Sequence, residues 1–241
     1  MQGRSRYALI FLLLSFARCG AEPCIESALL TPSTVSITRT FDEAERATEA
    51  ADLVGIQGTG WFMSPTTLVT VEHVAAAMKL SAQDWRLLNI QGAADSQAIF
   101  ARIQRLAGDG GEKLAVLELQ TAVSTARAVA IRMSPLAPED RLVTLAYPHQ
   151  RPRSAGGRFV QYVDDGGLAG TALLEMYDGN DRLAVDHGAS GAPVFDCEGR
   201  VAAVISTVIT QTFATPFSKS RVSTAWGSPN VVSVPIQNLS K

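Results

Sequence analysis

The sequence predicts an all-β fold built from two antiparallel β-barrels, and three observations carry this prediction. The 241 residues are 46% hydrophobic and 18% charged, a globular composition with enough chain for a large core. Short runs of β-type residues recur, separated by Gly, Pro, Ser and Asp. A stretch without a clear period, residues 128–140, divides these runs into two similar halves, and closing each half into a barrel would remove exposed sheet edges.

The runs of the two halves set the expected domain bounds. In the first half the expected strands are residues 60–63, 67–71, 98–103 and 114–119, with one or two helical turns at 73–80. In the second half they are residues 142–147, 158–163, 171–176, 193–195, 200–206 and 230–236. We therefore expect a first barrel over residues 54–127, an inter-barrel linker over 128–140 and a second barrel over 141–241.

The N-terminus is typical of a targeting segment. Arg4 and Arg6 precede the apolar run 7–17, which is too short to span a bilayer and has the length of a signal-peptide core. We expect a signal peptide over 1–21 and then a lead-in over 22–53, with a short helix or exposed loop at 41–51. A membrane anchor is the competing interpretation. Export to the periplasm or the exterior, with no stable membrane anchor after cleavage, is the prediction.

Cysteine usage bears on the oxidation state of the mature chain. Cleavage after Ala21 would leave Cys24 and Cys197. An even count in an exported protein permits one disulfide, which would close a loop through most of the chain. Two unpaired thiols are the alternative, because spacing alone does not show that two cysteines meet.

Charge and histidine content exclude several function classes. The formal net charge is −2 and the 21 basic residues are scattered, so we expect no nucleic-acid partner. The three histidines, at 73, 149 and 187, form no metal-ligand pattern. We expect no metal and no cofactor.

Two short motifs carry chemistry. Leu68–Val74 places His73 at the end of an apolar strand, where an imidazole can serve as a general base. Gly188–Pro193 places Ser190 between glycines, and such a turn can expose a hydroxyl and aim backbone N–H groups at a developing oxyanion. Each motif alone is weak, but together and in this order they indicate nucleophilic catalysis.

These segments resemble the chymotrypsin-like serine proteases, in particular the bacterial exported type. Residues 58–74 resemble the strand pair that leads to the catalytic histidine, 114–119 the strand after the catalytic aspartate, 188–193 the GxSGGP motif and 201–206 the next strand. The resemblance covers about residues 54–237. It implies two six-stranded barrels with the active site between them, Ser190 as nucleophile, His73 as base, and an oxyanion hole from the N–H groups of Gly188 and Ser190.

The sequence departs from the family pattern at two positions. Ala192 replaces the second glycine of the serine motif, a small change. The acid is the larger departure, because Lys113 stands where the family has its aspartate, and an ammonium group cannot accept a histidine N–H. Glu112 is one alternative, although a one-residue shift along a strand normally turns a side chain to the other face. Asp109, in a glycine-rich loop, is the second alternative, and absence of any acid is the third.

The same resemblance suggests the residues of a substrate pocket. The pocket base corresponds to Ala184, six residues before Ser190, and an alanine offers no carboxylate to a basic side chain. Small or apolar side chains are therefore expected at the cleavage site. His187 and Ser206 are further pocket candidates.

The sequence thus predicts a secreted serine endopeptidase that acts on polypeptides. A protease-fold binding protein with little or no catalysis is the alternative, and Lys113 supports it. An esterase that uses the same serine and histidine is a third candidate.

Overall fold

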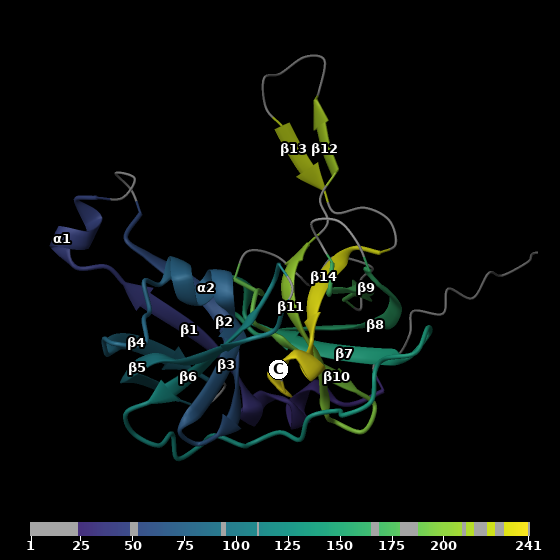
Figure 1. The fold of residues 1–241 in the computed structure, drawn as a ribbon, viewed down its shortest axis with the longest axis horizontal. Helices are drawn as coiled ribbons and strands as arrows, with labels where there is room; N and C mark the ends of the chain where they lie inside the picture. Colours follow the sequence, from purple (N-terminus) through teal and green to yellow (C-terminus); the bar gives the residue numbers. More distant parts are fainter. Residues whose placement is uncertain are drawn as a thin grey trace, which may run out of the picture.

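A computed structural model gives the fold of the chain (Figure 1). It describes residues 24–48, 53–92, 95–109, 111–164, 169–178, 188–208, 211–214, 221–224 and 229–240. Most of these residues form two closed antiparallel barrels of six strands each, which confirms the expected all-β fold class. The expected signal peptide, residues 1–21, lies outside the described residues.

The first barrel closes in the order β1-β2-β3-β6-β5-β4. Its strands are β1 (Thr34–Thr40), β2 (Gly55–Ser64), β3 (Thr67–Val71), β4 (Arg86–Gln91), β5 (Ser96–Ala107) and β6 (Leu114–Leu119). Strand β1 pairs with both β2 and β4 and so closes the barrel.

The position of β1 corrects the expected lead-in over residues 22–53. The segment Thr34–Thr40 has a polar composition, so its sequence did not suggest a strand. In the structure Val35 and Ile37 are buried in the barrel, and four Thr or Ser residues and Arg39 occupy the other five positions of the seven-residue strand. Strand β4 was likewise not among the expected strands.

The second barrel closes in the order β10-β11-β14-β9-β8-β7. Its strands are β7 (Arg141–Ala146), β8 (Arg153–Tyr162), β9 (Ala172–Tyr177), β10 (Pro193–Asp196), β11 (Val201–Val208) and β14 (Val231–Pro235). A separate hairpin of β12 (Gln211–Ala214) and β13 (Arg221–Thr224) extends away from the barrels in Figure 1.

Within the described residues, helices are few and short. The α-helices are α1 (Glu43–Arg46) and α2 (Glu72–Ala77), and the 3-10 turns are η1 (Ser27–Leu29), η2 (Thr31–Ser33), η3 (Pro148–Gln150) and η5 (Ile236–Ser240). Helix α2 occupies most of the segment expected to be helical at 73–80. Among the described residues, none of the helices has the length and apolar character needed to cross a membrane.

The core of the first barrel continues into the second. Trp61 and Phe62 are fully buried on β2, and the same apolar cluster includes Val143, Phe195 and Val204 from the second barrel. A further cluster fills the interior of the second barrel around Phe159 and Leu174. The two barrels therefore meet across a packed apolar interface, which gives a rigid frame to any site built between them.

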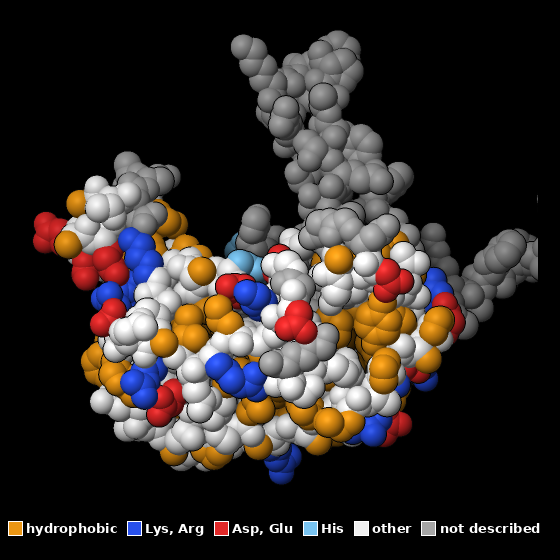
Figure 2. Space-filling model, in the orientation of Figure 1, with side chains coloured by type: hydrophobic (Ala, Val, Ile, Leu, Met, Phe, Trp, Pro, Cys, Tyr) orange, Lys and Arg blue, Asp and Glu red, His pale blue; other side chains and the backbone are white. Residues whose placement is uncertain are grey.

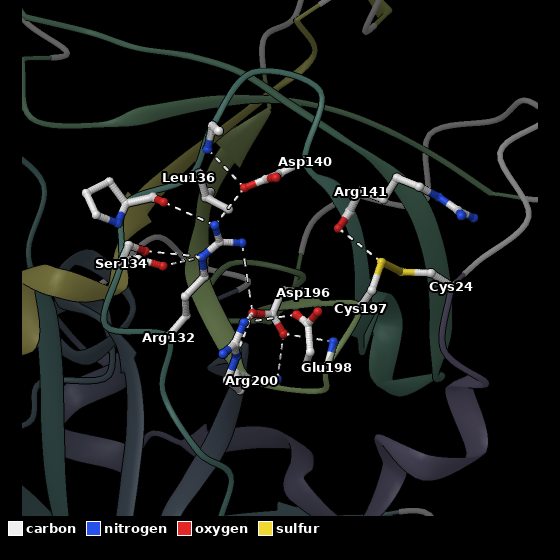
Figure 3. Close-up of polar contacts among 12 residues, drawn as sticks. Cys24, Arg132, Ser134, Leu136, Asp140, Arg141, Asp196, Cys197, Glu198 and Arg200 are labelled. Carbon is white, nitrogen blue, oxygen red and sulfur yellow. Dashed lines mark hydrogen bonds and ion pairs between the residues drawn. A yellow bond between two sulfur atoms is a disulfide. The ribbon is translucent and has the colours of Figure 1, made fainter.

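The inter-barrel linker is held along β11. Arg132 donates its backbone N–H to Val201 O at 2.8 Å. Its guanidinium lies 2.8 Å from Asp140 and 3.9 Å from Asp196, a carboxylate only 2% exposed (Figure 3). Through Arg132, these contacts tie the segment 128–140 to the second barrel.

The structure also joins Cys24 to Cys197 in a disulfide, which confirms the predicted bond (Figure 3). The bond connects the first described residue to the turn between β10 and β11. The segment before β1 is thus covalently attached to the second barrel.

One partly buried ion pair attaches α1 to the first barrel. The Arg39 guanidinium on β1 donates to Glu45 at 2.6 and 2.8 Å, and their side chains are only 5% and 14% exposed. The hydrogen bond from Arg39 is the main reason that the pKa of Glu45 lies below its usual value. Glu45 also completes a capping box with Asp42.

Replacing Glu45 with Gln is expected to reduce the free energy of unfolding by about 1–2 kcal/mol at pH 7, because the hydrogen bonds from Arg39 would lose their charged acceptor. Gln at this position still permits the capping box. Since the pKa of Glu45 is lowered by folding, the wild-type advantage is present above its unfolded-state value of about 4.5 and declines as the pH falls through the folded-state value. Urea unfolding at several pH values measures this. Glu43→Gln, an exposed change in the same helix, is the control and should leave stability nearly unchanged.

Candidate active site

His73 is delivered by the junction of β3 and α2. Val71 ends the strand in an extended conformation, and α2 begins at Glu72, whose N–H donates to Lys113 O at 2.9 Å. The strand thus carries the histidine to the end of the first barrel, and the helix turns it out of the core. The His73 side chain is 46% exposed and therefore accessible to a substrate.

Glu112 is the carboxylate that the structure places beside His73. Its Oε2 lies 3.5 Å from His73 Nδ1. Residues 111–113 form a bend before β6 begins at Leu114, so the alternation of side chains along a strand does not apply to Glu112. Within a regular strand, residue 112 would point to the opposite face from residue 113. In this bend the Glu112 side chain instead reaches His73.

Ser190 lies in a tight turn that needs its glycines. Gly188 and Gly191 have φ angles of +95° and +91°, a region that residues with a side chain rarely adopt. A Cβ on Gly191 would overlap the carbonyl oxygen of Thr59 and the hydroxyl of Thr70. Ala192, the departure from the family pattern, is fully buried.

The Ser190 hydroxyl donates to the carbonyl oxygen of Ser206 at 2.8 Å. Among the described residues it makes no hydrogen bond with His73. Transfer of its proton to the imidazole therefore requires a rotation about χ1 of Ser190, a motion open to a half-buried side chain.

Ser206 lies between these groups, on β11. It is fully buried, its carbonyl accepts from Ser190, and its hydroxyl donates to Glu112 Oε2 at 2.8 Å. Sequence reasoning had suggested Ser206 only as a pocket residue. Its contact with Glu112 crosses from one barrel to the other, and a sequence pattern carries no signal for such a contact.

The structure describes only some of the oxyanion-hole and pocket candidates. Gly188 is described, and its N–H and that of Ser190 belong to the same turn. Ala184 and His187, the remaining pocket candidates, lie outside the described residues. No group of three or more His, Cys, Asp or Glu within the described part of the chain is arranged to hold a metal ion.

Tyr147 contributes a backbone contact to the serine turn, since a Cβ on Gly188 would stand 3.3 Å from its carbonyl oxygen. Tyr147, at the end of β7, is 1% exposed, and burial raises the pKa of its hydroxyl above the usual value. Figure 2 shows acidic, basic and hydrophobic side chains interspersed over the viewed face.

Two six-stranded antiparallel barrels, with a histidine from the first near a carboxylate and a serine turn from the second, define the chymotrypsin-like class of fold. The chain belongs to the trypsin-like peptidase domain family, whose sequence model matches residues 58–204. The fold and the family are those of a serine protease. No curated protein matches the sequence.

Similar solved structures share the fold at low identity. The Rv3671c protease from M. tuberculosis in its active form has a TM-score of 0.61 and 16% identity, over 100% of this chain and 91% of that one. Its inactive form has a TM-score of 0.57 and 16% identity, over 89% of this chain and 88% of that one. A mutant of Rv3671c from M. tuberculosis H37Rv, also in an inactive form, has a TM-score of 0.54 and 15% identity, over 89% of this chain and 86% of that one.

Proposed function

We propose that this chain is an exported serine endopeptidase that cleaves polypeptides through an acyl-enzyme formed on Ser190. The observation that supports it best is the arrangement around Ser206. Its carbonyl contacts the Ser190 hydroxyl and its hydroxyl contacts Glu112, which in turn lies beside His73. This chain of contacts supports a site in which Ser190, His73 and Glu112 act together as nucleophile, base and acid.

In the proposed mechanism, the Ser190 hydroxyl rotates toward His73 and attacks the substrate carbonyl carbon. The proton of the hydroxyl passes to His73 Nε2, and the imidazolium then gives it to the leaving amine as the peptide C–N bond breaks. A water molecule hydrolyses the resulting ester in the same way and restores Ser190. The N–H groups of Gly188 and Ser190 stabilise the oxyanion of each tetrahedral intermediate.

Glu112 has the role of the acid in this proposal. Its carboxylate accepts the Nδ1–H of His73, so that Nε2 is left unprotonated and can take the serine proton. The hydrogen bond from Ser206 holds the carboxylate in place. Asp109 as the acid, and the absence of any acid, are the alternatives.

Export and substrate preference complete the proposal. The segment 1–21 supports export, and a disulfide fits an oxidising compartment. Ala184, six residues before Ser190, supports a preference for small or apolar side chains at the cleavage site. The substrate is therefore an extracellular or periplasmic polypeptide.

A second candidate is a protease-fold binding protein without catalysis. The Ser190 hydroxyl faces the Ser206 carbonyl and not the imidazole, and this observation favours that candidate. If the hydroxyl stays there, the base cannot activate it.

A fluorophosphonate probe distinguishes the two candidates. It phosphonylates a serine only where a base activates the hydroxyl. We expect covalent labelling of the wild-type protein and none of Ser190→Ala, measured by intact mass spectrometry on protein whose unfolding transition is cooperative. Wild-type protein that is folded but unlabelled would contradict the proposed function and support the binding protein.

A further inference from the structure

A residue of the first barrel contacts the serine turn of the second. Thr59, on β2, donates its N–H to Ser190 O at 2.9 Å. Its hydroxyl donates to Gly188 O at 2.7 Å and accepts the N–H of Tyr147 at 3.1 Å. Thr59 is fully buried, so water does not compete for these bonds.

This single side chain connects three segments. They are β2, the end of β7 at Tyr147, and the turn that holds Gly188 and Ser190. Both the donor and an acceptor site of the hydroxyl are used, which fixes its orientation. Thr59 is anchored in turn by Thr70, whose hydroxyl donates to Thr59 O at 2.8 Å.

Two neighbouring contacts leave the turn little freedom to move toward β2. Gln57 donates to Tyr147 O at 2.6 Å, and a Cβ on Gly188 would stand 2.9 Å from Gln57 Nε2. The backbone of Gly191 packs directly against Thr59. The position of the turn is therefore set by β2.

We propose that Thr59 is a positioning residue for the oxyanion hole, an inference that rests on the proposed function. The two carbonyl groups held by Thr59 belong to Gly188 and Ser190, the same residues whose N–H groups would bind the oxyanion. Fixing the carbonyl groups limits rotation of these residues. Donors that are already aligned stabilise the transition state without reorganisation, so their misalignment lowers kcat more than it raises KM.

The test compares Thr59→Val with Thr59→Ser. Valine keeps the shape of threonine and its backbone N–H, but leaves Gly188 O and Tyr147 N without the hydroxyl. Serine keeps the hydroxyl. For hydrolysis of p-nitrophenyl acetate, we expect Thr59→Val to lower kcat by about 10–100-fold with KM within about 3-fold, and Thr59→Ser to restore kcat to within about 3-fold.

Ser233→Ala is the matched control. Ser233 is also fully buried, and its hydroxyl donates to Ala172 O at 3.0 Å between β14 and β9. This variant loses a comparable buried hydrogen bond, so its Tm should fall as that of Thr59→Val does, with kcat unchanged. Equal losses of kcat in both variants, or wild-type kcat in Thr59→Val, would overturn the proposal.

Amide hydrogen exchange separates failure of this inference from failure of the proposed function. Exchange in a peptide that covers residues 188–192 should be faster in Thr59→Val than in the wild type, and unchanged in Thr59→Ser and Ser233→Ala. Unchanged exchange in Thr59→Val would overturn the positioning role even in an inactive protein. Absence of fluorophosphonate labelling in the wild type would overturn the proposed function, but it would not overturn the positioning role of Thr59.

Discussion

Replacing Glu112 with Gln is expected to lower kcat for p-nitrophenyl acetate by about 10⁴-fold, the loss that follows when the acid of such a triad becomes an amide. The reason lies in the histidine tautomer. A carboxamide at position 112 can donate its N–H to His73 Nδ1, which then becomes an acceptor. The ring proton moves to Nε2, and the imidazole can no longer accept the proton of Ser190.

The structure predicts that KM and folding change little in this variant. Glutamine has nearly the shape of glutamate, and when its amide nitrogen takes the place of Oε2, the Ser206 hydroxyl can accept from that nitrogen. Since the Glu112 side chain is 29% exposed, loss of its charge does not leave a buried polar group without water. The Tm of Glu112→Gln should therefore stay within a few degrees of the wild type.

Asp109→Asn is the control, since Asp109 is the other acid that the sequence offers. We expect its kcat to lie within about twofold of the wild type. A large loss in Asp109→Asn, with little loss in Glu112→Gln, would assign the acid to Asp109. Wild-type activity in both variants would show that neither carboxylate acts on His73.

The sequence predicted the two barrels and the histidine and serine motifs because these depend on local patterns. Strand β3 is a short run of β-type residues, buried from Leu68 to Val71, that ends two residues before His73, and the turn at Ser190 needs glycines at fixed places. The disulfide between Cys24 and Cys197, which the structure confirms, was predicted from the number of cysteines in an exported chain and not from a local pattern.

The remaining features depend on contacts between distant segments. The sequence did not decide which residue serves as the triad acid, because the path of residues 111–113 into β6 determines whether Glu112 reaches His73. The two bonds of Ser206 and the bonds of Thr59 join the barrels, and residues so far apart in sequence give no pattern. Strand β1 was not predicted, because only Val35 and Ile37 of its seven residues are apolar. Its pairing with both β2 and β4, which places it in the barrel, is a contact between distant segments.

The second large effect concerns stability. The double variant Cys24→Ser, Cys197→Ser is expected to lose about 4–5 kcal/mol of unfolding free energy under oxidising conditions. The bond joins residues 173 apart in sequence, so its removal frees a long loop in the unfolded chain, and chain-entropy models assign such loops an effect of this size. The native state should change little, because Cys197 is exposed and the two Cα atoms are only 5.3 Å apart.

Urea unfolding with and without a thiol reductant tests the origin of this effect. A crosslink that acts on the unfolded chain makes that chain more compact, so the double variant should show a larger m-value as well as a lower midpoint. Reduction should bring the wild type to the midpoint of the variant and leave the variant unchanged. If the double variant keeps the oxidised wild-type midpoint, the packing of buried Leu30 and its neighbours, and not the disulfide, holds the N-terminal segment on the second barrel.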